Sequence, residues 1–397
     1  MSALKALLKD VPVEWKALGE LTEIKTGEKP PIIAGIQTEF EYINAGTTNS
    51  GYCYDYNCNG DTVTTPSRGQ GGIGFIGYQI EKFWLGPLCY KIISKDNNKV
   101  LNKFLYYFIS SFRKLILDLK KEGGVPAVNK SDLEKIQIPI PHPNDPEKSL
   151  AIQQEIVRVL DSLSEQNKAL TTALAQEIDQ RKKQYEYYRE ELFRFESKEV
   201  EWKKISEIGT FQRGKRFVRT DMISEGVPCI HYGEMYTHYG IWAREAKSYL
   251  SAELVSSKKL RVAEKNDVVI VAAGETIEDI GKGTAWLGEE GVVIHDACFS
   301  YRSPLNPVYF AYFTRTILFH DQIRRNISSG KISAINEKGF SKVVIPVQSI
   351  QEQERIVRLL DQLDEATKNI VAQLEKEIEL RNKQYEYYRN QLLMFNG

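Results

Sequence analysis

The stretch Gln184-Tyr185-Glu186-Tyr187-Tyr188-Arg189 returns, residue for residue, at positions 384–389. A second pair of matching words lies upstream, Ile-Val-Arg-Val-Leu-Asp at 156–161 and Ile-Val-Arg-Leu-Leu-Asp at 356–361. Both pairs are separated by 200 residues, so neither copy has an insertion between its two words. A repeat at one fixed offset indicates that the same structural element occurs twice in the chain.

The repeated segments are predicted to be long helices. Apolar or aromatic residues recur at helical steps of three and four, apart from the polar positions 167 and 181. In the first copy they stand at 156, 160, 163, 170, 174, 178, 185, 188, 192 and 195. The second copy repeats the pattern 200 residues later. No Pro or Gly interrupts either stretch. A helix of about 45 residues spans roughly 65–70 Å and needs a partner for its apolar stripe. The other copy is the obvious partner, and because the second helix has to run back, the pair is expected to be antiparallel.

Two segments that differ in sequence and length precede the helices. They open alike, with Glu-Trp-Lys at 14–16 and 201–203, and the same offset of 187 pairs Gly27 with Gly214 and Ile43 with Ile230. Apolar runs at 267–272 and 291–295 predict strands, and the aromatic runs 104–108 and 308–313 predict helices; these runs are Asp-Val-Val-Ile-Val-Ala, Gly-Val-Val-Ile-His, Phe-Leu-Tyr-Tyr-Phe and Val-Tyr-Phe-Ala-Tyr-Phe.

The expected fold is therefore mixed α/β (α+β), with two globular domains and a long antiparallel coiled coil of two helices between them, in a pseudo-twofold arrangement. The expected boundaries are 1–146 and 197–348 for the globular domains, and 147–196 and 349–397 for the spacer helices. The tyrosine-rich end of each helix is expected to pack on the globular domain that the other helix leaves.

Composition restricts the function only weakly. The 53 basic and 53 acidic residues give zero net charge, which does not by itself support a nucleic-acid partner. The five cysteines are scattered without a C-x-x-C pair, which argues against a zinc site or a disulfide framework. No apolar run approaches the roughly 18 residues of a membrane span, and the first residues do not resemble a signal peptide, so a cytoplasmic protein is expected.

No catalytic motif stands out. The glycines of Gly274…Gly281-Lys282-Gly283 have six residues between them rather than four, and a glycine replaces the Ser or Thr of a phosphate loop. The word Asn-Pro-Val-Tyr at 306–309 is similar to the Asn-Pro-Pro-Tyr signature of amino-methyltransferases, but it lacks the second Pro and is explained by a helix N-cap followed by Pro. We expect no catalytic residue, no metal site and no cofactor in this chain.

The alternation of variable and constant segments resembles the DNA specificity subunit of type I restriction–modification systems. Local wording agrees: segments 67–78 and 272–282, Ser-Arg-Gly-Gln-Gly-Gly-Ile-Gly-Phe-Ile-Gly-Tyr and Ala-Ala-Gly-Glu-Thr-Ile-Glu-Asp-Ile-Gly-Lys, look like variants of the family's strand–loop segment. The resemblance implies that each variable unit is a target-recognition domain reading one half of a bipartite, asymmetric site in double-stranded DNA. It also implies that the helices set the spacing and dock two modification (methyltransferase) subunits, which would bring S-adenosylmethionine, and that a motor–nuclease restriction subunit can join.

The candidate DNA contacts are polar and basic residues in the loops of the variable units. Arg suits guanine edges or phosphates, Asn suits adenine, and Glu can accept from cytosine. The cluster at 212–216 is the best single candidate, because polar and basic residues crowd a predicted turn. The candidates are Thr26, Lys29, Asn44, Ser67, Arg68, Lys130, Arg213, Lys215, Arg216, Tyr232, Glu275 and Lys331, and the candidate partner-binding residues are Tyr185, Tyr188, Tyr385 and Tyr388.

Two other functions stay open at this point. The chain could be a self-contained methyltransferase or nuclease, against which the missing cofactor motifs weigh. It could also be a coiled-coil scaffold whose globular domains bind proteins or glycans, which the zero net charge permits.

Overall fold

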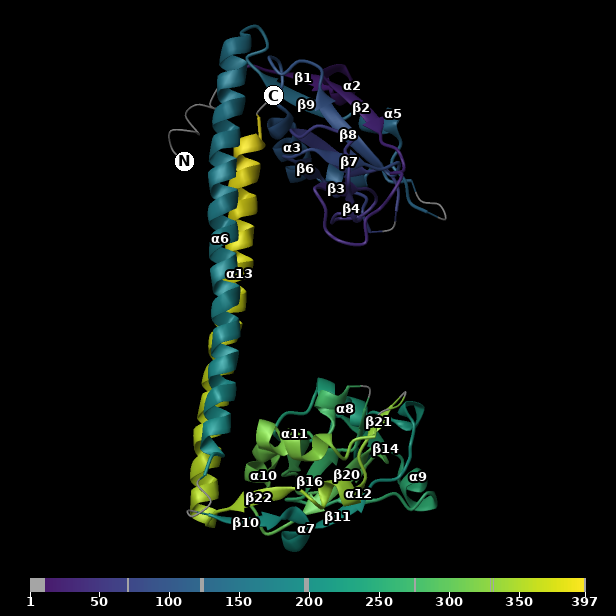
Figure 1. The fold of residues 1–397 in the computed structure, drawn as a ribbon, viewed down its shortest axis with the longest axis vertical. Coiled ribbons are helices and arrows are strands. Elements are labelled where there is room, and N and C mark those ends of the chain that lie inside the picture. The colour runs from purple at the N-terminus through teal and green to yellow at the C-terminus, as the bar shows by residue number, and fades with distance from the viewer. Residues whose placement is uncertain are drawn as a thin grey trace. The chain divides into compact units, whose positions relative to one another are not determined.

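A computed structural model describes residues 11–69, 71–121, 125–195, 200–274, 276–328, 330 and 332–395 (Figure 1). The chain divides into two compact units. Unit 1 comprises residues 1–175 and 375–397, and unit 2 comprises residues 176–374. Each unit therefore contains one globular part together with segments of both long helices, α6 (Pro146–Leu192, 47 residues) and α13 (Ile350–Leu393, 44 residues). The predicted pair of helices of about 45 residues is confirmed.

The globular part of unit 1 is built on two sheets and a short ribbon. Its four-stranded antiparallel sheet has the order β2-β8-β5-β6, its three-stranded sheet the order β4-β3-β7, and β1 pairs with β9. The strands are β1 (Val13–Ala17), β2 (Thr22–Thr26), β3 (Phe40–Ile43), β4 (Tyr52–Cys53), β5 (Thr62–Pro66), β6 (Gly77–Gln79), β7 (Phe83–Leu85), β8 (Cys89–Ser94) and β9 (Gln137–Pro141). The short helices are α2 (Leu18–Leu21), α3 (Asn102–Ser111), α4 (Lys114–Leu117) and α5 (Lys130–Leu133).

Unit 2 has sheets of the orders β11-β20-β16-β18-β13 and β14-β12-β19-β15, and the ribbons β10-β22 and β17-β21. Its strands are β10 (Glu201–Lys204), β11 (Thr210–Arg213), β12 (Val227–Ile230), β13 (Trp242–Ala243), β14 (Ser248–Leu250), β15 (Val262–Ala263), β16 (Val268–Val271), β17 (Ala273–Gly274), β18 (Gly283–Trp286), β19 (Val292–Ile294), β20 (Cys298–Arg302), β21 (Ser333–Ala334) and β22 (Val344–Val347). Its helices are α7 (Ile205–Ile208), η1 (Arg219–Asp221), α8 (Tyr232–Thr237), α9 (Ala252–Ser257), η2 (Ile277–Asp279), α10 (Pro307–Phe313), α11 (Ile317–Arg324) and α12 (Glu337–Phe340).

The two units share one strand plan despite their divergent sequences. The order β2-β8-β5-β6 in unit 1 corresponds to β11-β20-β16-β18 in unit 2, and β4-β3-β7 corresponds to β14-β12-β19. The middle strands of these last two sets are β3 in unit 1 and β12 in unit 2. Each pairs with one neighbour in parallel and with the other antiparallel. The predicted strands at 267–272 and 291–295 and the predicted aromatic helices at 104–108 and 308–313 are all confirmed.

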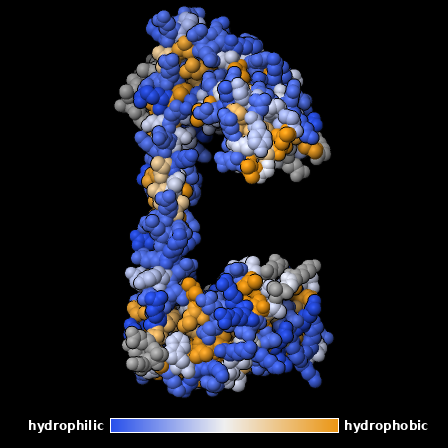
Figure 2. Space-filling model, viewed as in Figure 1, coloured by the Kyte–Doolittle hydropathy of each residue, from blue (hydrophilic) through white to orange (hydrophobic). Residues whose placement is uncertain are grey.

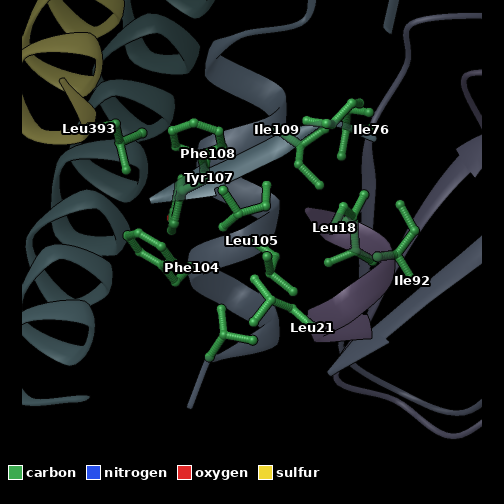
Figure 3. Close-up of a cluster of buried hydrophobic side chains, with 14 of the residues drawn as sticks. Leu18, Leu21, Ile76, Ile92, Phe104, Leu105, Tyr107, Phe108, Ile109 and Leu393 are labelled. Atoms are coloured by element: carbon green, nitrogen blue, oxygen red, sulfur yellow. The ribbon is translucent and has the colours of Figure 1, made fainter. Parts of the chain in front are cut away.

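The core of unit 1 takes side chains from both ends of the chain. Phe104, Leu105 and Phe108 of α3 pack with Ile156 and Leu160 of α6, and Leu392 and Leu393 of α13 lie in the same cluster. Figure 3 shows Leu393 entering this cluster from α13, beside Phe104, Tyr107 and Phe108. Burying these side chains is the main term that holds α3 and both helix segments together, at about 25 cal/mol for each Å² of apolar surface.

Unit 2 repeats this packing with the roles of the helices exchanged. Ile356 and Leu360, which begin α13, lie in one cluster with Tyr309 and Phe313 of α10. Phe193, which follows the end of α6, packs on the rings of Tyr309 and Phe313 at centroid distances of 5.0 and 5.7 Å. The end of α6 therefore lies against the start of α13 within this unit, as expected for tyrosine-rich ends that pack on the other globular part.

The antiparallel direction is explicit in unit 1. Asn167 Nδ2 donates to Asn382 Oδ1 over 2.9 Å, while Leu160, earlier in α6, shares a core with Leu392, later in α13. Residue numbers therefore rise along one helix in the direction in which they fall along the other, so the two helices are antiparallel. The surface of the helices in Figure 2 is mostly hydrophilic, as expected where the apolar stripes of two helices face each other.

The repeated words anchor each helix to a globular part. Asp161 accepts from Tyr107 Oη at 2.6 Å, and its counterpart Asp361 accepts from Tyr312 Oη at 2.7 Å. Gln153 Oε1 accepts from the backbone N–H of Leu101, and Gln353 Oε1 from that of Asn306, so each Gln satisfies an amide at the start of α3 or α10. These residues recur in the sequence because each unit makes the same contact between a long helix and its globular part.

Candidate nucleic-acid interface

Three connections of unit 2, those after β11, after β12 and between β19 and β20, meet at one edge. Arg213 ends β11, Tyr232 follows β12, and His295 lies between β19 and β20. They surround a half-open cavity of about 350 Å³, large enough for a nucleobase or a phosphate group. The described residues that line it are Arg216, Phe217, Val218, Arg219, His231, Tyr232, Ala273, Gly274, His295, Asp296, Ala297 and Ile332.

Gly214 allows the backbone of the basic cluster to approach this edge. Its N–H donates to Cys298 O over 2.9 Å, and that of Lys215 donates to Ile294 O over 3.2 Å. A Cβ at Gly214 would lie 2.2 Å from His295 O, so a larger residue cannot occupy the position without displacing the strand connection. The matching Gly27 of unit 1 is equally confined, since a Cβ there would lie 1.9 Å from Leu85 O. Both glycines were visible in the sequence, and close packing is the reason for them.

The basic residues of unit 2 divide into anchored and available ones. Arg213 Nε donates to Asp296 O over 2.9 Å, and Lys215 Nζ lies 3.4 Å from Lys258 O, so both side chains have partners on the protein. Arg216 and Arg219 are exposed and line the cavity, and neither forms an ion pair with any residue that the structure describes. The guanidinium groups of Arg216 and Arg219 are thus better placed than Arg213 and Lys215 to meet an anion or a base edge.

Aromatic rings form the wall of the cavity. His231 lies 4.6 Å from both Tyr232 and His295, and Phe217 lies 5.1 Å from His295, measured between ring centroids. Burial lowers the pKa of both histidines, and the neighbouring His295 lowers that of His231 further, so both are neutral near pH 7.

A neutral histidine has one donor nitrogen and one acceptor nitrogen. His231 Nδ1 accepts from the N–H of Gly233 at 3.2 Å, and His295 Nδ1 accepts from the N–H of Ala297 at 3.1 Å. Asp296 Oδ1 also lies 3.0 Å from His295 Nδ1, but a backbone N–H can only donate, so Nδ1 of the neutral ring is the acceptor. In both rings the proton is therefore on Nε2.

Unit 2 is expected to lose stability in mild acid. Burial holds the pKa of His231, His295 and His320 below the usual value of about 6.5. Because the unfolded chain then binds more protons, the stability of unit 2 falls as pH drops through 6.5, and the loss is complete below the folded pKa values of the three histidines. Hydrogen exchange at pH 7.5 and 5.5, corrected for intrinsic rates, should show lower protection of β16 and β20 at the lower pH. Equal loss in β5 and β8 of unit 1 would contradict this cause.

The candidate residues of unit 1 gather on the corresponding edge. Thr26 ends β2, Asn44 follows β3, and Ser67 and Arg68 follow β5. Backbone bonds from Gly27 to Gly86 O and from Ser67 to Leu88 O tie these segments to the β7–β8 connection. Thr26, Lys29, Arg68 and Lys130 are exposed, Asn44 is half-buried, and Ser67 is buried.

Some candidates are already engaged within the protein. Asn44 Oδ1 accepts from the N–H of Leu88 at 2.9 Å, so Asn44 cannot form the two bonds to adenine that its residue type suggested without breaking this contact. Lys130 lies 3.6 Å from Glu134, an exposed pair that is easily exchanged for a phosphate. Glu275 and Lys331 lie outside the described residues.

The offset of 187 aligns the two edges, since it pairs Thr26 with Arg213, Lys29 with Arg216 and Asn44 with His231. The last pair is supported by the backbone, because Gly86 donates to Ile43 O and His295 donates to Ile230 O. Among the residues at this cavity, Tyr232 was predicted from the sequence as a DNA contact, whereas His231, Arg219 and His295 were not. The offset itself was the signal that could have identified His231.

The tyrosines of the helices are placed unequally. Tyr185 is half-buried, with its pKa raised to about 12 by burial and Arg189 over its ring at 5.8 Å. Tyr385 is likewise half-buried beside Arg389, whereas Tyr188 is exposed and Tyr388 half-buried. The most exposed members of the two words are Tyr187 at 59% and Tyr387 at 56%, each in edge contact with the next tyrosine. A partner that recognises both words would meet these two rings first.

The described residues contain no group of three His, Cys, Asp or Glu that could hold a metal ion, and the five cysteines are buried and unpaired. Among the helices of the described ranges, none combines the length and the apolarity that crossing a membrane requires.

Two different polar edges on one strand plan, each in a unit completed by both repeated helices, define a two-headed recognition protein. The chain belongs to the family described as the type I restriction modification DNA specificity domain, whose sequence model matches residues 11–180 and 197–380. The expected resemblance and the mixed α/β fold are therefore confirmed.

Similar proteins extend over the whole chain. It is 30% identical to the Escherichia coli type I restriction enzyme EcoR124I/EcoR124II specificity subunit, over 100% of this chain and 97% of that one. It is 29% identical to a putative type I specificity subunit of Haemophilus influenzae, over 99% and 98%.

Solved structures agree in fold. A chain from a study of complex assembly and conformational transition in the type I R-M system has a TM-score of 0.72 at 16% identity, covering 97% of this chain and 98% of that one. The HsdS subunit of Thermoanaerobacter tengcongensis has a TM-score of 0.53 at 16% identity, covering 96% and 95%. The relatives are specificity subunits, so this chain is a non-catalytic recognition subunit, and neither the self-contained enzyme nor the protein- or glycan-binding scaffold is supported.

Proposed function

We propose that each unit reads one half of a bipartite, asymmetric site in double-stranded DNA. The carrying observation is that equivalent strand connections present different side chains, with Asn44 in unit 1 where unit 2 has His231. A shared scaffold with unlike reading residues suits two unlike half-sites. Phosphate contacts from exposed cations such as Lys29 and Arg68 would help to position the protein on the duplex.

The repeated helices are proposed to dock two methyltransferase subunits. Because the two sequence words are identical, they are expected to make the same contacts with a partner. Tyr187 and Tyr387 are exposed to nearly the same degree. S-adenosylmethionine and the transfer of its methyl group to adenine would belong to those subunits, and a motor–nuclease subunit can join the complex. The site of action is the cytoplasm, where host DNA lies.

Mapping methylated adenines in cells that carry this chain and its methyltransferase tests the proposal. We expect one motif with two unlike halves separated by a gap of constant length, because helices of fixed length would set the spacing of the two readers. A continuous motif, or no methylation from a well-assembled complex, would overturn the proposed function.

Removing the two guanidinium groups that line the cavity of unit 2 should weaken binding. Arg216→Ala with Arg219→Ala is expected to lower the affinity for duplex DNA and to reduce the slope of log K against log salt by up to about 2. Each cation held against the duplex, at a phosphate or at a base edge, displaces about 0.9 counterion. Fluorescence anisotropy of a labelled duplex between about 50 and 200 mM salt measures both. Arg325→Ala, an exposed cation of unit 2 that does not line the cavity, is the control. An unchanged slope in the double variant would remove this edge from the interface.

A further inference from the structure

The cavity of unit 2 offers hydrogen-bond donors on its side chains. Arg216 and Arg219 can only donate, and His231 has its single acceptor nitrogen occupied by the N–H of Gly233. What His231 can still offer is the N–H at Nε2, since no residue in the described part of the chain bonds to that atom. Asp296 is the one acidic side chain among the described lining residues, and its backbone carbonyl is held by Arg213.

The equivalent position in unit 1 follows the same rule with a different residue. Asn44 Oδ1 already accepts from the N–H of Leu88, which turns this oxygen toward the protein backbone and leaves the amide N–H groups to point elsewhere. Both residues directly follow the middle strand of the smaller sheet, after Ile43 and Ile230. In two units of divergent sequence, this position therefore carries a side chain whose acceptor atom takes a backbone hydrogen bond and whose N–H remains available.

We propose that His231 is a specificity-determining residue that, with Arg216 and Arg219, selects a guanine in the half-site read by unit 2. This inference rests on the proposed function, since it takes DNA as the ligand of this edge. It adds the identity of one base and the residue that selects it.

The choice of guanine follows from matching donors with acceptors. In the major groove guanine presents two acceptors, N7 and O6, whereas adenine presents one acceptor beside an amino donor. An amino group facing His231 Nε2–H and the two guanidinium groups would be left unpaired, which costs more than a missing favourable contact. Cytosine, the partner of guanine, presents an amino donor that the Asp296 carboxylate at the same edge can accept.

A backbone phosphate is the alternative acceptor-only ligand. It would use the same donors without selecting a base, so the two ligands separate in experiment. Loss of a phosphate contact lowers affinity for every sequence and reduces the salt slope, whereas loss of a base contact relaxes one position of the motif.

Two nearly isosteric substitutions isolate the donor. His231→Asn and His231→Asp both supply a side-chain oxygen to cap the N–H of Gly233 at the start of α8, so the local fold is kept in both. Asn retains outward N–H donors, as Asn44 does naturally in unit 1, while Asp presents only acceptors. The pair therefore differs in donor or acceptor character at one point.

The experiment uses the full chain in complex with its methyltransferase, with methylated adenines mapped for the wild type and both variants. We expect the wild-type motif to contain a fixed guanine that His231→Asn retains and His231→Asp relaxes, with discrimination against adenine falling about tenfold or more. The other half of the motif should be unchanged in both variants, which also reports that the complex has assembled. A wild type without any bipartite motif would count against the proposed function instead.

Duplexes with altered guanine at the identified position complete the test. 7-Deazaguanine removes the N7 acceptor and should reduce wild-type discrimination, whereas inosine keeps N7 and O6, loses only the minor-groove amino group and should be tolerated. The proposal is overturned if neither half contains a fixed guanine, if His231→Asp leaves the motif unchanged, or if the variant lowers only affinity and salt slope. The last result would assign the pocket to a phosphate.

Discussion

Exchanging residues 201–347 for the corresponding segment of another family member is expected to change one half of the methylated motif completely and to leave the other half intact. The boundaries follow from the β10–β22 ribbon, in which Glu201 pairs with Val347 and Lys204 with Val344. A cut at 345, inside β22, would divide this ribbon between donor and recipient. Cutting outside it transfers the whole recognition fold of unit 2 together with its closing strands.

The measurement is the methylation map of the chimera in complex with the methyltransferase. The reciprocal exchange of 13–141, bounded by the β1–β9 pair Val13↔Pro141, is the matched control and should alter the other half only. Recipient helix residues such as Phe193 and Leu360 stay in the core, so the donor must carry similar repeated words. A chimera that changes both halves, or the gap between them, would contradict separate reading by the two units.

The helices were predictable because their signal is local. The recurrence of apolar residues every three or four positions depends on neighbours within two turns, and the apolar run of β16 is equally local. Pairing of β3 with β7 in parallel joins residues far apart in sequence, for which no short pattern exists. The shared strand plan was therefore hidden, and only confined positions such as Gly27 and Gly214 kept a trace of it.

The site was predictable as a region and less so as residues. The loops that follow Thr26 and Ile43 do converge, although β2 and β3 belong to different sheets, because Gly86 of the β7–β8 connection bonds to both loops. Which side chain is available depends on partners from distant segments: Arg213 is held by Asp296, 83 residues further along the chain. A polar residue type says that a contact can be made, but the backbone around it decides whether its donors or its acceptors remain.

Truncating Leu393 to alanine is expected to destabilise unit 1, although this residue follows all of unit 2 in the sequence. Leu393 is fully buried in the core of unit 1 beside α3, and losing it leaves a cavity that costs about 2–5 kcal/mol. The counterpart, Phe193→Ala, should destabilise unit 2 by about 3–5 kcal/mol, because its ring packs on Tyr309 and Phe313.

Hydrogen exchange followed by mass spectrometry reports on each unit separately, because peptides from β5 and β8 probe unit 1 and peptides from β16 and β20 probe unit 2. Leu393→Ala should speed exchange in the first set, and Phe193→Ala in the second. Met394→Ala, at a neighbouring side chain that is 60% exposed, serves as the control and should change neither set by more than about 0.5 kcal/mol. Faster exchange in unit 2 after Leu393→Ala would mean that the end of α13 does not complete unit 1. Faster exchange in unit 1 after Leu393→Ala and in unit 2 after Phe193→Ala would establish that each recognition unit depends for its core on both constant helices. Exchange of variable segments would then succeed only where those helices are retained.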